Sequence, residues 1–236
     1  MEKNWRIKEM LYIVTFAALA VVLSLFEIPL GLPWLKIDLS EIVVLVAFIS
    51  IGFNKTLLII LIRGLLRQFI QGDILVPTEL WGEVIAMIAS ITLMASFYVI
   101  SKIYNREEKP LFRRKECNVT KISPSEFIIT VIGVTVVLSL VMIILNIFIT
   151  TPIYLSLYAY FLEIIPLEGF HFTVFTLLDD PGMTNVFGVD LSNWKLYLTY
   201  IIANYALLNV SKGIITSIIF IPIRESLYHM NLNYLN

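Results

Sequence analysis

Two polar side chains interrupt an apolar run near the C-terminal end of the sequence. Asn209 and Lys212 are three residues apart in a stretch made mostly of Leu, Ile, Val and Ala, so on a helix they project from one face. A carboxamide offers a donor and an acceptor side by side, which suits a ligand with an amide or imide edge. Asn146 adds a third polar group in another apolar run. Ordinary hydrogen bonding between helices explains any one of these residues alone, but their joint placement predicts a ligand site.

Further ionisable residues fall in or beside apolar runs, where they are costly unless they face a cavity or each other. They are Asp38, Glu41, Arg63, Arg67 and Glu83. Arg63 and Arg67 are one helical turn apart and share a face, and Glu83 could pair with either of them. These residues are candidates for ligand binding, and a buried salt-bridge network that holds the helices together is the alternative.

The segment Asp38-Leu39-Ser40-Glu41 also predicts the start of a helix. Asp or Ser at an N-cap position accepts hydrogen bonds from free backbone amides. Glu41 falls at a capping-box position, where its carboxylate would reach back to the N-cap. We therefore expect a local capping role for this segment, whatever else it does.

The sequence contains no motif for phosphoryl transfer, hydrolysis or metal catalysis. The patterns G-x-x-x-x-G-K-[ST], H-E-x-x-H and G-x-S-x-G are absent, which excludes ATP hydrolysis by a phosphate loop and argues against an enzyme. The single Cys117 excludes an intramolecular disulfide and a multi-cysteine metal site. Only His171 and His229 are present, so neither a metal site nor a bound cofactor is expected.

The composition assigns these residues to a membrane protein. Hydrophobic residues make up 58% of the 236-residue chain and charged residues only 15%, against about half and about a quarter in globular proteins. The mean hydropathy is +0.87. The formal net charge is −1, so no global basic field attracts nucleic acid. We predict an all-α integral membrane protein forming a single membrane domain, residues 1–236.

Six apolar segments predict six transmembrane helices. They span about 10–26, 40–53, 56–71, 80–104, 125–149 and 197–222, with a long outer loop at about 150–196. The second and third segments are barely long enough to cross, so a re-entrant hairpin is the alternative there. The first segment resembles a signal peptide, but its apolar run continues to Phe26, which favours an uncleaved helix.

The distribution of basic residues predicts the orientation. Lys3, Arg6 and Lys8 precede the first segment, and seven Lys and Arg residues lie between Lys102 and Lys121. Because cytoplasmic loops are enriched in Lys and Arg, both regions belong in the cytoplasm. With six crossings the C-terminus lies on the same side. The sequence predicts cytoplasmic N- and C-termini.

Several segments resemble the riboflavin-binding S components, the substrate-binding subunits of energy-coupling factor (ECF) transporters. Ile28-Pro29 and Leu35-Lys36-Ile37-Asp38-Leu39-Ser40-Glu41 resemble their signature I-P-x-x-x-x-x-L-K-x-D-F-S-D-x-P at the start of helix two. Arg63 resembles their basic residue in helix three, and Gly82-Glu83 the G-E that starts helix four. Taken in order, these matches support membership of the family.

Two further matches extend the resemblance over nearly the whole chain. Asn146-x-x-x-x-x-Pro152-x-Tyr154 resembles N-x-x-x-x-x-P-x-Y at the end of helix five, and Leu208 to Gly213 resembles F-N-x-x-K-G in helix six. The departures are Leu39, Glu41 and Val43 for Phe, Asp and Pro, Phe53 for Pro after Gly52, Gly64 for Asn, and Leu208 for Phe. They affect the identity of the ligand more than the family, because S components share a fold and carry different vitamins.

The resemblance implies a multi-pass subunit of the bacterial plasma membrane that captures riboflavin or a related flavin from outside. It implies a transmembrane coupling subunit and two ATPase subunits as partners, beside the lipid bilayer. The implied ligand-binding residues are Trp34, Lys36, Asp38, Arg63, Glu83, Asn146, Tyr154, Asn209 and Lys212. Trp34 and Lys36 would close the first loop over the ligand. Riboflavin is here a transported ligand and not a cofactor.

The resemblance also implies a partner interface on helix one. The family docks through small residues there, and this chain offers Ala17, Ala18, Ala20 and Ser24, which allow close helix approach. Alternative functions remain at this point: an S component for another vitamin, or one for a phosphorylated flavin bound through Arg63 and Arg67. A stand-alone secondary carrier and a membrane enzyme are the alternatives from other classes.

Overall fold

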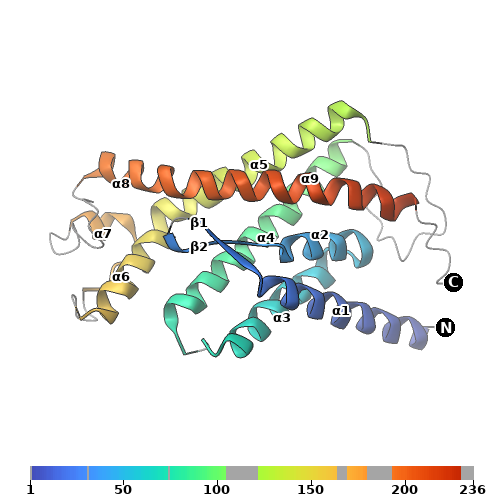
Figure 1. The fold of residues 1–236 in the computed structure, drawn as a ribbon, viewed down its shortest axis with the longest axis horizontal. Coiled ribbons are helices and arrows are strands. Elements are labelled where there is room, and N and C mark those ends of the chain that lie inside the picture. Colours follow the sequence, from blue (N-terminus) through green and yellow to red (C-terminus); the bar gives the residue numbers. More distant parts are fainter. Residues whose placement is uncertain are drawn as a thin grey trace.

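In the computed structural model, the helical segments of the described residues run back and forth along the long axis of the molecule (Figure 1). The structure describes residues 2–30, 32–73, 75–104, 122–163, 169–179 and 193–229. The first segments are α1 (Glu2–Ser24), α2 (Ser40–Ile51), α3 (Phe53–Gln71) and α4 (Pro77–Ile103). The fifth joins α5 (Pro124–Leu145) to α6 (Thr151–Phe161), and the sixth joins α8 (Trp194–Ile201) to α9 (Leu207–His229). The prediction of a mainly helical membrane protein is confirmed.

Within the described residues, four helices are long and apolar enough to cross a membrane. They are Ile7–Ser24, Pro77–Ile103, Pro124–Phe161 and Trp194–Leu227. Ser40–Ile51 is a shorter apolar helix, and α3, with 19 residues, carries Arg63 and Arg67. The start of α1 and the end of α9 lie at the same end of the molecule (Figure 1).

The predicted outer loop contains more helix than the sequence indicates. Instead of ending near residue 149, the fifth segment passes through a π-helical turn, η2 (Asn146–Thr150), and continues as α6. A short helix, α7 (Val174–Leu178), follows, and α8 begins at Trp194 and passes through a second π-helical turn, η6 (Ile202–Ala206). The wide π turn accommodates Pro152, a residue that normally ends or kinks a helix.

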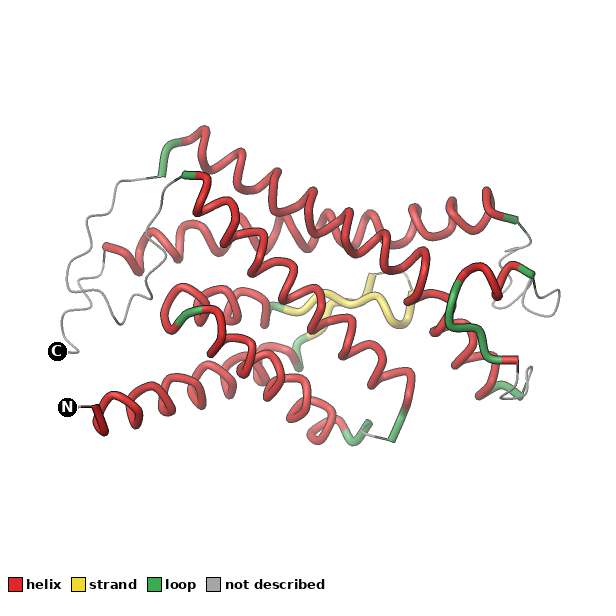
Figure 2. Tube along the Cα trace, turned by 180° about the vertical axis from the view of Figure 1, so that it is seen from behind, coloured by secondary structure: helices red, strands yellow, loops and turns green. Residues whose placement is uncertain are grey.

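The first loop forms a β-hairpin, the strand structure seen in Figure 2 among the helices. Strands β1 (Glu27–Leu30) and β2 (Leu32–Asp38) pair antiparallel, with Glu27 opposite Asp38 and Ile28 opposite Ile37. Because residues paired across a ladder lie close together, the carboxylates of Glu27 and Asp38 are both carried at the base of the hairpin. The hairpin therefore places Glu27 and Asp38 next to the start of α2.

Helices α5 and α9 pack closely against each other beside Lys212. A Cβ added to Gly213 would lie 2.8 Å from Thr135 Cα, a separation that real Cβ atoms do not adopt. Glycine therefore lets α9 approach α5 directly beside Lys212. A buried cluster with Val134, Leu138 and Phe220 continues this contact, and a separate cluster joins α6, α7 and α8 through Leu155, Leu177 and Tyr197.

Candidate substrate-binding site

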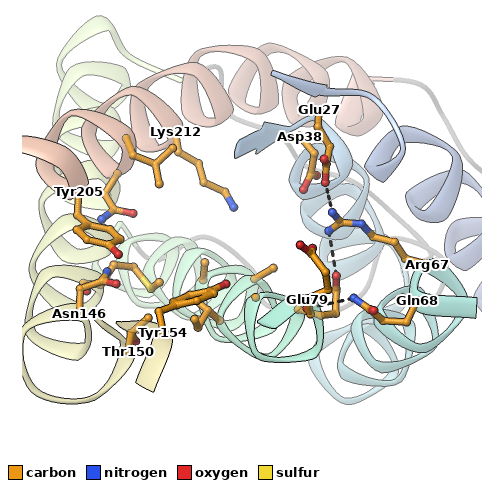
Figure 3. Close-up of a pocket in the computed structure, with 18 residues that line it drawn as sticks. Glu27, Asp38, Arg67, Gln68, Glu79, Asn146, Thr150, Tyr154, Tyr205 and Lys212 are labelled. Atoms are coloured by element: carbon orange, nitrogen blue, oxygen red, sulfur yellow. Dashed lines mark hydrogen bonds and ion pairs between the residues drawn. The ribbon is translucent and has the colours of Figure 1, made fainter. Parts of the chain in front are cut away.

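A pocket opens between the hairpin and helices α3, α4, α5, α6 and α9 (Figure 3). It encloses about 910 Å³, counting its open mouth. Its polar lining residues are Glu27, Asp38, Arg67, Gln68, Glu79, Glu83, Asn146, Thr150, Tyr154, Tyr205, Asn209 and Lys212. In Figure 3 the labelled charged residues of the hairpin and α3 face the amide and aromatic side chains across the space. The pocket therefore has two chemically different walls.

The first wall is a network of arginines and carboxylates. Arg67 Nη1 donates to Glu83 Oε2 at 2.9 Å, and Arg67 Nη2 pairs with Glu27 at the start of the hairpin. Arg63 Nη2 lies 3.6 Å from Glu83 Oε1. The prediction that Glu83 can pair with Arg63 or Arg67 is confirmed, since it contacts both. The network links α3, α4 and the hairpin.

Arg63 lies beneath the pocket and does not line it. Its side chain is 1% exposed, and Nη1 donates to Ser40 Oγ at 2.9 Å. Ser40 in turn donates to Asp38 through its backbone N–H at 2.8 Å and through its hydroxyl. Arg63 thus supports the start of α2, and Arg67 takes the lining position that the sequence assigns to Arg63.

Lys212 extends from α9 into the pocket and pairs with a carboxylate on α2. Its Nζ lies 2.7 Å from Glu41 Oε1, and the two side chains are 8% and 1% exposed. Figure 3 shows the Lys212 side chain crossing toward the middle of the site. The expectation that a buried lysine needs a counter-charge is met. The predicted capping-box role of Glu41 is wrong, because its carboxylate serves this ion pair, whereas Asp38 accepts the amide at the start of the helix.

The second wall carries unused hydrogen-bonding atoms. Asn146 is 2% exposed, and its Nδ2 donates to Met142 O at 2.7 Å. Among the described residues, Asn146 Oδ1 and Asn209 Nδ2 have no hydrogen-bond partner. An unpaired polar group costs free energy in a buried site. A ligand can remove this cost if it donates a hydrogen bond to Asn146 Oδ1 and accepts one from Asn209 Nδ2. Their pairing requirement matches an amide or imide edge.

Tyr154 lies beside the two amides, as its motif position suggests. A Cβ added to Gly82 would lie 2.6 Å from Tyr154 Oη, so glycine at this point of α4 leaves room for the phenol. Tyr154 and Tyr158 stack at 6.4 Å between ring centroids. Gly82 therefore leaves room for the Tyr154 ring in the second wall, and its neighbour Glu83 binds the arginines of the first wall.

Several lining residues were not predicted from the sequence, namely Glu27, Gln68, Glu79, Thr150 and Tyr205. Gln68 Nε2 donates to Glu79 O at 3.2 Å, and its Oε1 has no partner among the described residues. Thr150 is four residues after Asn146 and Tyr205 four before Asn209. This helical spacing was the available signal. Nothing comparable links Glu27 to the site, because it reaches Arg67 only through the hairpin.

Two groups of predicted residues, the closing residues of the first loop and the partner interface of helix one, have little or no counterpart in the part of the chain that the structure describes. Trp34 and Lys36 lie in β2, and their side chains fall outside the described residues. On α1, Ala17, Ala20 and Ser24 are buried inside the subunit, where the two alanines pack with Ala47, Ile51 and Ile59. Ala18 alone of the four predicted interface residues is exposed. The small residues of α1 thus serve internal packing first.

The described residues contain no group of His, Cys, Asp and Glu suited to a metal ion.

Comparison with known proteins decides the family. The family model for the ECF transporter, substrate-specific component, matches residues 8–224. The chain belongs to this family. It is therefore an S component, an integral membrane protein that binds a substrate and is not an enzyme.

The fold supports the same assignment. A solved structure described as "Structure and mechanism of the S component of a bacterial ECF transporter" matches with a TM-score of 0.57 and 21% sequence identity. The match covers 98% of this chain and 99% of that one. No curated protein matches. ECF S components pair with a transmembrane coupling subunit and ATPases, so this chain is one part of a multi-pass plasma-membrane importer.

Proposed function

We propose that this S component captures riboflavin or a closely related neutral flavin from outside the cell and passes it to a coupling subunit driven by two ATPases. The observation that carries the proposal is that, among the residues the structure describes, Oδ1 of Asn146 and Nδ2 of Asn209 have no hydrogen-bond partner in one buried wall. A flavin ring presents an imide edge with an N–H donor and carbonyl acceptors, which complements these atoms. The rings of Tyr154 and Tyr205 offer flat apolar surface to the rest of the ring system.

The charged wall favours a neutral ligand over the phosphorylated alternative. Arg67 is engaged by Glu83 and Glu27, and Arg63 by Glu83 and Ser40. An anionic group would have to displace these carboxylates from the arginines. The carboxylates suit the hydroxyl groups of a polyol chain, which donate hydrogen bonds.

The proposal includes six membrane crossings, cytoplasmic termini and one membrane domain over residues 1–236. It is supported by the six helical segments that alternate in direction and by the shared end of α1 and α9 (Figure 1). The basic residues near the N-terminus and before α5 assign that end to the cytoplasm. In this orientation the pocket and the hairpin face outward.

Asn146→Ala and Asn209→Ala should each weaken riboflavin binding about tenfold to a hundredfold. Each change removes a hydrogen bond from a desolvated site, which costs roughly 1–3 kcal/mol. Titration by quenching of flavin fluorescence measures the affinity, and Asn204→Ala is the matched control, because Asn204 lies on the same helical segment and does not line the pocket. If both site variants bind as tightly as the parent protein while staying monodisperse, the flavin does not use this wall.

The purified protein in liposomes should bind riboflavin without accumulating it. The sequence has no phosphate loop and so cannot hydrolyse ATP by that route. In the proposed function the energy for uphill transport comes from partner ATPases. The measurement is uptake of labelled riboflavin into vesicles with and without the coupling subunit and ATPases. Concentrative uptake by the protein alone would contradict the proposal and favour a secondary carrier.

A further inference from the structure

The π-helical turn η2 leaves one backbone carbonyl without an intrahelical donor. In this turn the N–H of Thr151 donates to Asn146 O, five residues earlier. In the same register the donor to Ile147 O would be the N–H of residue 152, but residue 152 is a proline and has none. An unsatisfied carbonyl inside a membrane bundle costs several kcal/mol. The turn therefore needs an external donor.

Tyr197 supplies this donor from α8. Its hydroxyl donates to Ile147 O at 2.6 Å and lies 3.4 Å from Asn146 O. Tyr197 is 0% exposed and packs in the cluster with Leu155 and Leu177, so the hydroxyl is held in a fixed position. It does not line the pocket.

The π turn decides where Thr150 lies relative to Asn146. A π turn inserts one extra residue into a helical turn and rotates the residues that follow relative to those before it. Asn146 stands at its first position, with Nδ2 bound back to Met142 O and Oδ1 unpaired at the pocket. Without the π turn, Asn146 and Thr150 would not both keep their places in the lining of the pocket.

We propose that Tyr197 is a positioning residue for substrate binding: by replacing the hydrogen bond that Pro152 cannot make, its hydroxyl holds the π turn that brings Asn146 and Thr150 together in the lining of the pocket. This inference rests on the proposed flavin site for its binding test. It also makes a separate prediction about the ligand-free protein, which can be tested without riboflavin.

The binding test compares Tyr197→Phe with Asn146→Ala and with the double variant, using riboflavin as the probe. Tyr197→Phe removes only the hydroxyl and should lower affinity by about tenfold or more. The double variant should lose less affinity than the sum of the two single losses, because both changes act on the same part of the lining. Tyr200→Phe is the matched control on the same helix and should bind like the parent. Unchanged affinity in Tyr197→Phe, or additive losses in the double variant, would overturn the proposal.

Hydrogen exchange in the absence of ligand tests the turn itself. The backbone amides of Thr150, Thr151 and residues 153–155 should exchange faster in Tyr197→Phe than in the parent or in Tyr200→Phe, and unchanged exchange would overturn the inference. If the parent does not bind riboflavin, the proposed function fails while this measurement still decides the role of Tyr197. If Tyr197→Phe does not stay monodisperse, Pro152→Ala is added, because the restored N–H can donate to Ile147 O. Recovery supports the proposal, and no recovery contradicts it.

Discussion

Replacing Lys212 with methionine should destabilise the protein severely. The change leaves the Glu41 carboxylate, 1% exposed, without the ammonium that lies 2.7 Å away. Removing one partner of a buried ion pair costs about 3–5 kcal/mol, a large fraction of the stability of a typical protein. The thermal unfolding midpoint in detergent, followed by size-exclusion chromatography after heating, measures the loss.

The double variant Glu41→Gln/Lys212→Met separates folding from binding. It removes both charges and should recover most of the lost stability, since a neutral pair carries no uncompensated buried charge. If Lys212 also contacts the flavin, the double variant folds and binds riboflavin more weakly. An unfolding midpoint of Lys212→Met equal to that of the parent would contradict the role of the Glu41–Lys212 pair.

Riboflavin 5′-phosphate should bind at least about a hundredfold more weakly than riboflavin. Five carboxylates, from Glu27, Asp38, Glu41, Glu79 and Glu83, line or adjoin the pocket against three cationic side chains, those of Arg63, Arg67 and Lys212. Like charges brought together in a desolvated site cost several kcal/mol. Competition titrations against riboflavin measure the ratio of the two affinities.

Glu79→Gln tests the cause of this discrimination. Among the described side chains, the Glu79 carboxylate has no ion-pair partner. Neutralising it should therefore reduce the difference in affinity between riboflavin and riboflavin 5′-phosphate and leave the ion pairs of the two arginines intact. Glu163→Gln, at the end of α6 and away from the pocket lining, should leave the gap unchanged. Equal binding of both flavins by the parent would show that Arg67 is open to anions and would favour the phosphorylated ligand.

Local spacing predicted the parts of the site that lie on single helices. Asn209 and Lys212 share one face of α9, and Arg63 and Arg67 share one face of α3, because helical periodicity fixes which side chains of one helix lie together. The apolar runs predicted the main helices for the same reason. Asn146 was found as a polar residue in an apolar run and Tyr154 through the family motif, and both line the pocket.

The remaining features depend on contacts between distant segments. No local pattern links Glu41 to Lys212 or Glu27 to Arg67, since each pair is brought together only by the packing of α2 against α9 and by the hairpin. The π turn at Asn146 was also invisible, because Pro152 by itself predicts a helix end. The hydroxyl of Tyr197, some 50 residues away along the chain, makes the continuation of the helix possible.

In the orientation that we propose, the short α2 sets how deep the ligand lies in the membrane. Twelve residues of helix rise about 18 Å, whereas the hydrocarbon core is about 30 Å thick. If Ile51 lies at the cytoplasmic boundary, Ser40 and Glu41 lie about 12 Å below the outer boundary, and Lys212 meets Glu41 at that level. A ligand that reaches Lys212 has therefore already travelled more than a third of the permeability barrier before any ATP is spent, which shortens the distance left for the energised step.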